Sequence, residues 1–438
     1  MADDSAAPVR RERGRRGRAA QAEHSPVIIA SFSKLPTTTS STYTHEPLPK
    51  VGSVEPRHMA FVNDTMCSLE DTSLRWSDTE LAGVRSSRGE WLRRNTVNKE
   101  AYAPLCTNLS VLKSSLLALG YVGYWQAFSE AWFCSLSTST QLRTRSEKAG
   151  SYSWRPEGCK RTAPLAALQP HAIDKALSGG RVLTLVGDSV TDQQFLSLFC
   201  LLGSVVDRTS LNGSRAFSLV GGGRVQHLRT DFLVDSRHAL TSGILNLTLL
   251  RQKDGTYHYR STRIDEAWAP RLRYGSKSSA DVLLLSTGYH WPEFGLNALR
   301  FASLMHQVLE QLKSAGFAGQ ILYRTLFAPG CGDEPNNNRT SFLPPSAPHG
   351  WARYREYDQE AAALAHPYVS TSGKPLWSIL NVSVSTSKRV DGHCGECHAR
   401  LPGGSKAHDC LHYCLMPGGP VDLWNAALIG ALEAKDAL

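Results

Sequence analysis

The chain has 438 residues, 41% of them hydrophobic, and a formal net charge of +9 at pH 7. This length and apolar content allow a full buried core, as in soluble globular proteins. Six arginines against one glutamate in Arg10–Arg18 supply five of the nine charges. Basic residues are not interleaved with aromatic residues elsewhere, so no nucleic-acid partner is expected. No stretch reaches the ~18 apolar residues that a membrane-spanning helix needs.

Cysteines and glycosylation motifs indicate the secretory pathway. The ten cysteines are an even number spread along the chain, which is typical of disulfide-bonded proteins from oxidising compartments. Six Asn-x-Ser/Thr acceptors occur, at Asn63, Asn108, Asn212, Asn246, Asn338 and Asn381. An N-terminal anchor missing from this sequence would reconcile these signals with the lack of an apolar span. Membrane association is expected only through such an anchor.

The composition divides the chain into a tail and a folded domain. Residues 1–60 are rich in Arg, Ser, Thr and Pro and show no hydrophobic period, so we predict a disordered basic tail. The domain is expected over 61–436. Its first part, 61–160, is rich in cysteine and aromatic residues and precedes the first buried strand. We expect this part to form a disulfide-tied layer wrapped on the main sheet.

A candidate nucleophile follows the first buried strand, Val182–Val186. Gly187 ends this strand, and apolar residues recur at helical spacing from Val190 on. Asp188 and Ser189 therefore lie on a strand-to-helix turn, where backbone N–H groups at a helix N-terminus stabilise negative charge. Ser189 can act as a nucleophile if a histidine reaches it. The alternative is that Asp188 or Ser189 only caps the helix.

Strands and helices alternate after this turn, which favours an α/β fold with a mainly parallel sheet covered on both faces. The predicted strands are 281–285, 319–325 and 376–385, and the predicted helices are 298–315 and 421–434. The strand at 281–285 leads into Ser286–Trp291, at the sheet edge where open α/β sheets bind ligands. Gly221–Gly223 forms either a plain turn or, through Gly222, a loop that lends backbone N–H groups to the site.

Two chemistries compete for the polar C-terminal segment. On one helical turn, the Asp409 carboxylate would orient the His412 imidazole so that its free nitrogen faces a nucleophile. Alternatively, zinc could be held by His393, Cys394, Cys397, His398, Cys410 and Cys414. The even cysteine count and the glycosylation motifs favour disulfides over zinc. His393, His408 and Asp391 fit a substrate loop or the surface better than a catalytic role.

Six short motifs carry a family resemblance. They are W-R-P-E-G-C at 154–159, V-G-D-S ending at Ser189, L-S-T-G-Y-H-W at 285–291, Y-R-T at 323–325, R-V-D-G-H at 389–393 and D-C-L-H-Y-C-L-M-P-G-G-P at 409–420. Together they resemble the PC-esterase family of trichome-birefringence-like proteins, within the SGNH/GDSL hydrolases. The resemblance runs from about Cys67 to Leu432. It implies an SGNH-type three-layer sandwich and a Golgi polysaccharide O-acetyltransferase.

The resemblance also implies roles for site residues. By position, Ser189 would be the nucleophile, His412 the base and Asp409 the residue that orients the base. We expect oxyanion and substrate contacts from Gly187, Asp188, Gly222, Ser286, Gly288, His290, Arg389, Asp391 and His393. The acetyl donor would be a co-substrate and the acceptor a glycan or polysaccharide, with no cofactor or metal. The protein would work in the Golgi or secretory lumen, or alternatively outside the cell.

The chain departs from the family pattern on both sides of this site. It has Asp192, Gln193 and Gln194 where the family usually has Arg-Asn-Gln, and we expect the Asp192 charge to repel an anionic intermediate. Ser286 stands where the family usually has Asn, so a shorter side chain would replace the amide. Tyr289–Trp291 reads Tyr-His-Trp where the family usually has His-Trp-Trp. Two further activities would use the same fold: a carbohydrate acetylesterase with water as acceptor, or a non-catalytic glycan-binding protein.

Overall fold

The sheet of this protein is built around strand β3 (Val182–Gly187), whose six residues are all buried. Its run of leucine and β-branched side chains without polar alternation is typical of a strand covered on both faces. The computed structural model describes residues 89–93, 104–156, 170–233, 281–292, 296–314, 316–339, 348–364, 377–395 and 409–436. All of these residues belong to one compact unit, Asn63–Leu438.

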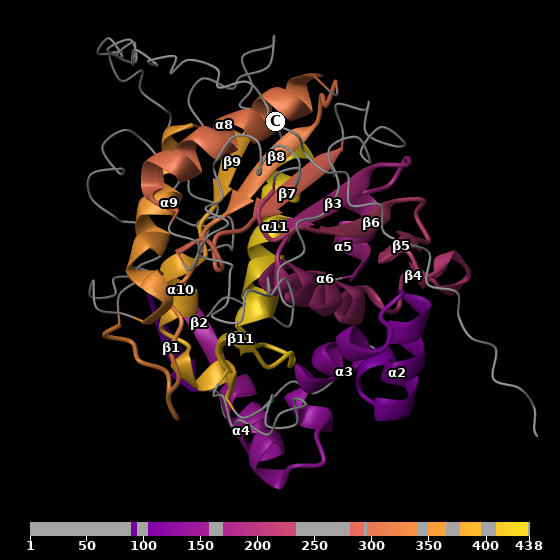
Figure 1. Cartoon of the computed structure of the whole chain (residues 1–438). Coiled ribbons are helices and arrows are strands. Elements are labelled where there is room, and N and C mark those ends of the chain that lie inside the picture. The colour runs from indigo at the N-terminus through magenta and orange to yellow at the C-terminus, as the bar shows by residue number, and fades with distance from the viewer. Residues whose placement is uncertain are drawn as a thin grey trace, which may run out of the picture. The chain divides into compact units, whose positions relative to one another are not determined.

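Seven strands form the sheet in the order β4-β5-β6-β3-β7-β8-β9 (Figure 1). The others are β4 (Val206–Asp207), β5 (Ala216–Leu219), β6 (Arg224–Arg229), β7 (Val282–Ser286), β8 (Gln320–Arg324) and β9 (Trp377–Leu380). The strands from β6 to β9 run parallel, and β5 and β4 extend the β6 edge antiparallel. Because β3 precedes both of its neighbours in the chain, β3 and β7 flank a topological switch point, where such sheets bind ligands.

Two layers of helices cover the faces of the sheet (Figure 1). One holds α5 (Pro170–Ala176), α6 (Ser189–Leu202) and α11 (Pro420–Asp436), and the other holds α8 (Ala298–Ser314) and α9 (Tyr354–Ala363). Consecutive residues of β8 point to the two faces. Tyr323 packs on Phe301 of α8, whereas the Arg324 guanidinium lies 4.4 Å from the ring centroid of Trp424 on α11. The three-layer α/β fold expected from the sequence is confirmed.

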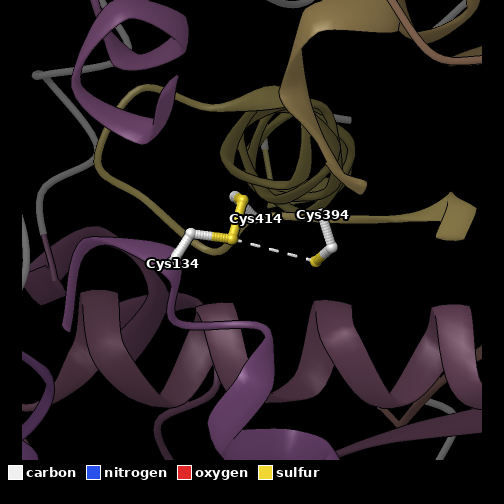
Figure 2. Close-up of side chains that lie close together, drawn as sticks. All are labelled: Cys134, Cys394 and Cys414. Carbon is white, nitrogen blue, oxygen red and sulfur yellow. Dashed lines mark hydrogen bonds between the residues drawn. A yellow bond between two sulfur atoms is a disulfide. The ribbon is translucent and has the colours of Figure 1, made fainter. Parts of the chain in front are cut away.

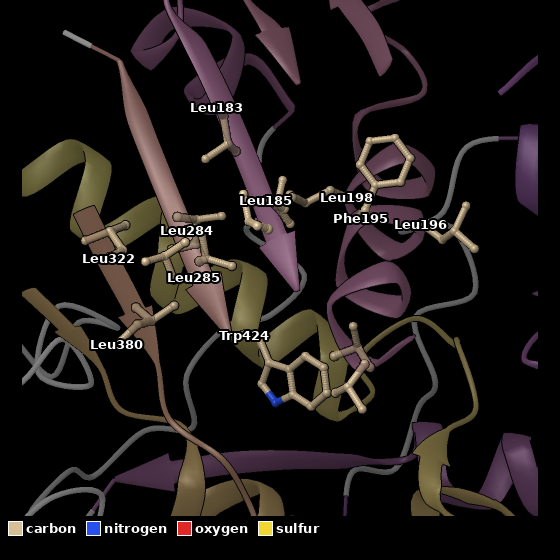
Figure 3. Close-up of a cluster of buried hydrophobic side chains, with 14 of the residues drawn as sticks. Leu183, Leu185, Phe195, Leu196, Leu198, Leu284, Leu285, Leu322, Leu380 and Trp424 are labelled. Carbon is tan, nitrogen blue, oxygen red and sulfur yellow. The ribbon is translucent and has the colours of Figure 1, made fainter. Parts of the chain in front are cut away.

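Apolar side chains fill the space between these layers (Figure 3). Each side chain labelled in Figure 3 is at most 1% exposed. Leu284 and Leu285 are neighbours on β7 and point to opposite faces, so one strand contributes to both halves of the core. Burying a leucine of this kind contributes ~1.5–3 kcal/mol. The carboxyl ends of β3 and β7 are therefore held rigidly where the site begins.

The predicted elements agree with the structure within two residues, except for the strand at 376–385. That prediction is wrong beyond Leu380, where β9 ends. The Asn381 side chain accepts hydrogen bonds from the backbone N–H and the hydroxyl of Ser383. An Asn side chain that bonds the backbone two residues on turns the chain. The short helix α10 (Ser383–Ser387) follows this turn.

The described N-terminal residues form a layer tied to the main domain by disulfides. Its elements are β1 (Gly89–Arg93), η2 (Pro104–Cys106), α2 (Leu109–Ala118), α3 (Tyr124–Ala131), η3 (Cys134–Leu136), α4 (Thr140–Gly150) and β2 (Tyr152–Pro156). One disulfide joins Cys106 to Cys200 of α6, and another joins Cys134 to Cys414. The expected disulfide-tied layer is confirmed for these residues.

Several expectations fall outside the described residues: the tail 1–60, Cys67, Cys159, Cys397, His398 and His408.

Five short elements complete the described chain: η5 (Arg208–Ser210), η9 (Pro348–Arg353), η10 (Val390–Gly392), β10 (His393–Gly395) and β11 (Asp409–Tyr413). None of the helices in the described part of the chain has the length and apolarity needed to span a bilayer.

Gly187→Ala is expected to lower the free energy of unfolding by at least about 3 kcal/mol. A Cβ atom at this position would collide with the carbonyl oxygen of Ser286 and with the side chain of Thr191. Gly179→Ala is the matched control. Gly179 has a φ of +76°, but a Cβ atom added there would meet none of the surrounding atoms within 4 Å. Its left-handed backbone should cost only about 1–2 kcal/mol. Urea unfolding of both variants tests this, and equal costs would contradict it.

Candidate active site

Ser189 is the first residue of α6, directly after the turn that ends β3. Asp188 is the N-cap: its Oδ1 accepts a hydrogen bond from the backbone N–H of Val190 at 3.0 Å. Because Asp188 caps the helix, the Ser189 hydroxyl remains available for another partner. The backbone N–H of Ser189 belongs to the first turn of α6, where N–H groups lack intrahelical acceptors and favour negative charge.

His412 joins Ser189 to Asp409. The His412 Nε2 atom lies 2.7 Å from Ser189 Oγ, and Nδ1 lies 2.8 Å from Asp409 Oδ2. All three side chains are buried. A carboxylate accepts a hydrogen bond from Nδ1–H, which leaves Nε2 as the acceptor for the serine hydroxyl. The structure therefore brings together, as a continuous hydrogen-bonded chain, three residues that come from two distant parts of the sequence.

Asp409 and His412 do not lie on a helical turn, so that part of the prediction is wrong. They belong to β11, which pairs antiparallel with β10. His393 pairs with Tyr413, and Gly395 pairs with Asp409, so three residues of β11 lie opposite one of β10. A bulge of this kind re-aims side chains. Asp409 Oδ1 stabilises it by accepting hydrogen bonds from the backbone N–H groups at 411 and 412.

Gln193 and Trp132 hold the strand that carries His412. Gln193 donates from Nε2 to the carbonyl oxygen of Tyr413 at 2.6 Å, and its Oε1 accepts from the Tyr413 N–H at 3.1 Å. The Trp132 ring stacks on the His412 imidazole at 5.4 Å between centroids. The Trp132 carbonyl also accepts from the N–H of Leu415. The sequence contained no signal for these contacts, because each joins residues more than two hundred positions apart.

Gly222 lies at the wrong edge of the sheet to serve this site. Gly221–Gly223 forms the turn between β5 and β6, at the start of β6. Val182 pairs with Arg224, whereas Gly187 pairs with Arg229. The turn is therefore separated from the Ser189 edge by the length of β3, roughly 17 Å. The plain-turn alternative holds, and the proposal that this loop lends N–H groups to the site is wrong.

The segment after β6 lies at the sheet edge beside Ser189, where Gly222 was expected. The N–H of Thr230 donates to the carbonyl oxygen of Gly187 at 2.9 Å. The carbonyl oxygen of Asp231 accepts from Thr287 Oγ1 at 2.7 Å and from Trp291 Nε1 at 2.9 Å. Thr230 and Asp231 were not singled out from the sequence. They join the loops after β6 and β7 beside the turn that carries Ser189.

The loop after β7 places Gly288 and His290 at the same edge. Gly288 has a φ of +140°, and a Cβ atom there would lie 2.7 Å from Leu326 Cδ1, so only glycine fits. His290 is half-buried, and its Nε2 has no hydrogen-bond partner among the described residues. Burial raises the pKa of Asp188, while the nearby His290 and Arg324 side chains oppose this rise. His290 thus acts electrostatically on the residue next to Ser189.

Arg389 and Asp391 bind each other. Arg389 Nε lies 2.8 Å from Asp391 Oδ1, and Nη2 lies 3.1 Å from Oδ2, in a fully buried pair. Arg389 Nη2 also donates to the carbonyl oxygen of Ala149, the penultimate residue of α4. These contacts attach η10 to the N-terminal layer. A substrate role for either side chain would require breaking a buried bidentate pair, which is costly.

His393 supports the strand beside His412. Its Nδ1 lies 3.2 Å from the carbonyl oxygen of His412, and its ring stacks on Tyr413 at 3.9 Å between centroids. Burial lowers the pKa of His393 to about 3, against the smaller opposing effects of Asp409 and of the His412 carbonyl. The imidazole is therefore neutral near pH 7, with Nδ1–H as the donor. Its position supports β11 rather than a substrate loop.

The Asp192 charge is neutralised on the far side of α6. Asp192 accepts from the hydroxyl of Tyr121 and lies 3.1 Å from His227 Nδ1, 3.5 Å from Arg215 and 3.6 Å from Arg229. Burial favours the protonated form, but Arg215, His227 and Arg229 outweigh it and hold the pKa of Asp192 well below its usual range. With two guanidinium groups in contact, the expected repulsion of an anionic intermediate is compensated.

Three cysteines lie together beside the strand that carries His412 (Figure 2). The sulfur atoms of Cys134, Cys394 and Cys414 lie within 4.8 Å of one another, and the Cys394 thiol is 3.9 Å from Cys134 Sγ. Because Cys134 and Cys414 are bonded, this cluster offers a single thiol. Cys410 is bonded to Cys331. Two of the six zinc ligands considered from the sequence, Cys410 and Cys414, are therefore used in disulfides and cannot bind zinc.

Gln193→Leu is expected to lower the reactivity of Ser189 toward a serine-directed phosphonate at least tenfold. Loss of both hydrogen bonds to Tyr413 lets β11 shift, and a displacement of ~1 Å at a reacting group can cost ~100-fold. Gln226→Leu is the matched control, because Gln226 bonds Thr184 in the middle of the sheet. Labelling rates by intact mass test this. Equal rates in the two variants would show that Gln193 does not position His412.

His393→Gln is expected to flatten the acid dependence of stability. The folded-state pKa of about 3 lies below the unfolded value, so between roughly pH 6.5 and 3 only the unfolded chain gains this proton. Its contribution to stability is present above pH 6.5 and falls by about 1.4 kcal/mol per pH unit on acidification. Urea unfolding from pH 8 to 4 measures this slope. At pH 8 the two chains differ in packing and in the hydrogen bond to the His412 carbonyl but not in this protonation, and parallel pH slopes would refute the assignment.

Known proteins match this chain in the region of the site and beyond it. Residues 330–431, which include Asp409 and His412, match the PC-esterase family, described as a GDSL/SGNH-like acyl-esterase family found in Pmr5 and Cas1p. Protein trichome birefringence-like 13 of Arabidopsis thaliana is 24% identical over 339 residues, covering 68% of this chain and 76% of that protein. Protein trichome birefringence-like 42 of the same plant is 25% identical over 305 residues, covering 64% and 77%.

A solved structure described as a GDSL-like lipase from Parabacteroides merdae aligns with 12% identity over 58% of this chain and 98% of its own, with a TM-score of 0.31. A TM-score this low adds nothing to the sheet topology described above. The resemblance expected from the motifs is confirmed by the sequence matches: residues 330–431 match the GDSL/SGNH-like PC-esterase family, and the chain is similar to trichome birefringence-like proteins.

Proposed function

We propose that this protein is an O-acetyltransferase that transfers an acetyl group to a hydroxyl of a polysaccharide through an acyl-Ser189 intermediate. The observation that carries the proposal is the hydrogen-bonded chain from Ser189 Oγ through His412 to Asp409, with distances of 2.7 and 2.8 Å. A serine, an imidazole and a carboxylate in this order are the parts of an activated acyl-transfer nucleophile. The match of residues 330–431 to a family described as acyl-esterases supports the same class of chemistry.

The proposed reaction has two halves. In the first, Ser189 Oγ attacks the acyl carbon of the donor and its proton passes to His412 Nε2; the leaving group then takes that proton. In the second, His412 accepts the proton of a sugar hydroxyl, whose oxygen attacks the acyl-serine. The bond between the acyl carbon and Ser189 Oγ then breaks, and His412 returns the proton to Ser189 Oγ. Asp409 keeps the His412 Nδ1–H oriented and stabilises the imidazolium in both halves.

Groups at the carboxyl edge of the sheet would stabilise the oxyanion. The N–H of Ser189 lies at the start of α6, where the helix dipole favours negative charge. The segment Thr230–Asp231 and the loop that begins at Ser286 flank this position. They replace the Gly221–Gly223 turn in this role, because that turn lies at the opposite edge.

A carbohydrate acetylesterase is the second candidate. It would use the same residues with water in place of the sugar hydroxyl, and the description of the matching family as acyl-esterases favours it. The two reactions differ in how well the acyl-enzyme is shielded from water. Incubation with an acetyl donor and an unacetylated glycan, and separately with an acetylated glycan, distinguishes them. A mass gain of the first indicates a transferase, and a mass loss of the second an esterase.

The disulfides support a place in the secretory pathway, since such bonds persist in oxidising compartments. Three glycosylation motifs, at Asn108, Asn212 and Asn338, have exposed asparagines. Asn381 is buried and its side chain bonds Ser383, so this motif cannot accept a glycan in the folded chain. A glycosylated protein would therefore carry glycans at the exposed positions and not at Asn381.

Ser189→Ala is expected to abolish covalent labelling by a serine-directed phosphonate and all acetyl transfer. His412→Gln and Asp409→Asn should slow labelling by about 10³–10⁴-fold, because the serine then lacks a correctly oriented base. Ser197→Ala is the control: Ser197 is buried in the same helix, and its hydroxyl bonds Asp422 and Asn425. A wild-type chain that binds glycans but is never labelled at Ser189 would instead support the non-catalytic glycan-binding alternative.

A further inference from the structure

A buried thiol lies against the disulfide next to the strand that carries His412. Cys394 Sγ is 3.9 Å from Cys134 Sγ, and both sulfur atoms lie within 4.8 Å of Cys414 Sγ (Figure 2). Cys134 and Cys394 have no exposed surface, and Cys414 is 1% exposed. Burial shields this thiol from reagents in solution, so the two sulfur atoms of the disulfide are the reaction partners within its reach.

Cys394 lies where the pairing of β10 with β11 is irregular. It is the middle residue of β10, between His393, which pairs with Tyr413, and Gly395, which pairs with Asp409. Cys394 is therefore the single residue of β10 opposite the three bulged residues of β11, one of which is the proposed base. Because a bulge locally interrupts the ladder of hydrogen bonds, β10 can adjust at Cys394 while the pairs on both sides remain.

We propose that these three cysteines form a thiol–disulfide exchange site, in which Cys394 replaces Cys414 as the partner of Cys134. The Cys394 thiolate attacks Cys134 Sγ, the bond between Cys134 and Cys414 breaks, and the Cys414 sulfur takes up the proton that Cys394 has lost. One S–S bond forms and one breaks, so the exchange consumes neither an oxidant nor a reductant. Cys134 is the sulfur attacked, because the Cys394 thiol contacts it directly.

The exchange moves a covalent attachment from β11 to β10. Before it, the disulfide joins Cys134 of the N-terminal layer to Cys414, the residue directly after β11. After it, the same layer is bonded to β10, and Cys414 becomes a thiol. The end of β11 is then less restrained beside His412, and a small displacement of a catalytic group lowers reactivity. This effect on His412 rests on the proposed function, whereas the exchange itself does not.

Disulfide mapping of the full-length protein tests the exchange. Protein purified below pH 6 is held at pH 6 or at pH 8.5, then alkylated in acidic denaturant, where thiolates are scarce, and digested without reduction. We expect a peptide with a Cys134–Cys394 bond and an alkylated Cys414, formed at least about tenfold faster at pH 8.5, because the thiolate is the nucleophile. The Cys331–Cys410 disulfide is the internal control and should stay intact in the same digests.

Two variants test the effect of the exchange on the site. Cys394→Ser lacks the attacking thiol, so the pH 8.5 treatment should leave its rate of Ser189 labelling at pH 7 unchanged. The wild-type chain should lose labelling in proportion to its exchanged fraction. Cys414→Ser holds the exchanged state: it should contain the Cys134–Cys394 bond and label Ser189 at least about threefold more slowly than Cys394→Ser. If Cys414→Ser fails to fold, the treated wild-type chain and Cys394→Ser still decide.

Four results would overturn this inference alone. They are the absence of a Cys134–Cys394 bond at both pH values, its formation at equal rates at both, a Cys394–Cys397 bond in the untreated protein, and equal Ser189 labelling of exchanged and unexchanged chains. Scrambling of the control disulfide at the same rate would do so too, because the reaction would then not be specific to this cluster. A wild-type chain that is never labelled at Ser189 would overturn the proposed function, while the mapping still decides the exchange.

Discussion

The site depends on one requirement: the strand β11 must lie against the first turns of helix α6. Only then can the imidazole of His412 reach the hydroxyl of Ser189, 223 residues earlier in the chain. Several independent contacts meet this requirement. Gln193 binds both backbone groups of Tyr413, and the Cys134–Cys414 disulfide attaches the end of the strand to the N-terminal layer. The Trp132 ring also stacks on the imidazole of His412. The two Gln193 hydrogen bonds act together with the disulfide and the stacked ring, since a net hydrogen bond contributes only ~1 kcal/mol.

Buried charges around the site are compensated in separate clusters. Asp192 is balanced by Arg215 and Arg229 on one side of α6, and Arg389 is paired with Asp391 under the N-terminal layer. An uncompensated charge at such depth would cost several kcal/mol, so these groups stabilise the fold only as pairs. Arg324 differs from them, because its direct hydrogen bonds go to neutral partners, Ser286 and Gln194. Its positive charge therefore remains to act on groups at the carboxyl edge of the sheet.

One departure from the family pattern, Ser286, is connected in three dimensions to Gln194, a position that follows the pattern. Gln194 and Ser286 are 92 positions apart in the numbering, yet one guanidinium binds both. Gln193, next to Gln194, binds the strand that carries His412. Tertiary structure also explains why Thr230–Asp231, and not the expected turn Gly221–Gly223, lies beside Ser189. The parallel register of β3 and β6 decides which end of β6 meets Ser189, and that register is a property of the sheet as a whole.

The sequence by itself determined the α/β class and the turn that presents Ser189, because these depend on local patterns: a buried strand, a glycine and a helical period. Its short motifs also carried the family resemblance. It also singled out Asp409 and His412, although it assigned them to a helical turn. Only the tertiary structure decided that a strand bulge joins these two residues, that Gly222 lies at the far edge, and that Arg389 and Asp391 bind each other. Strand register, disulfide pairing and buried ion pairs join residues tens to hundreds of positions apart. No local period in a single sequence encodes such partners, because they are selected by the packing of the whole domain.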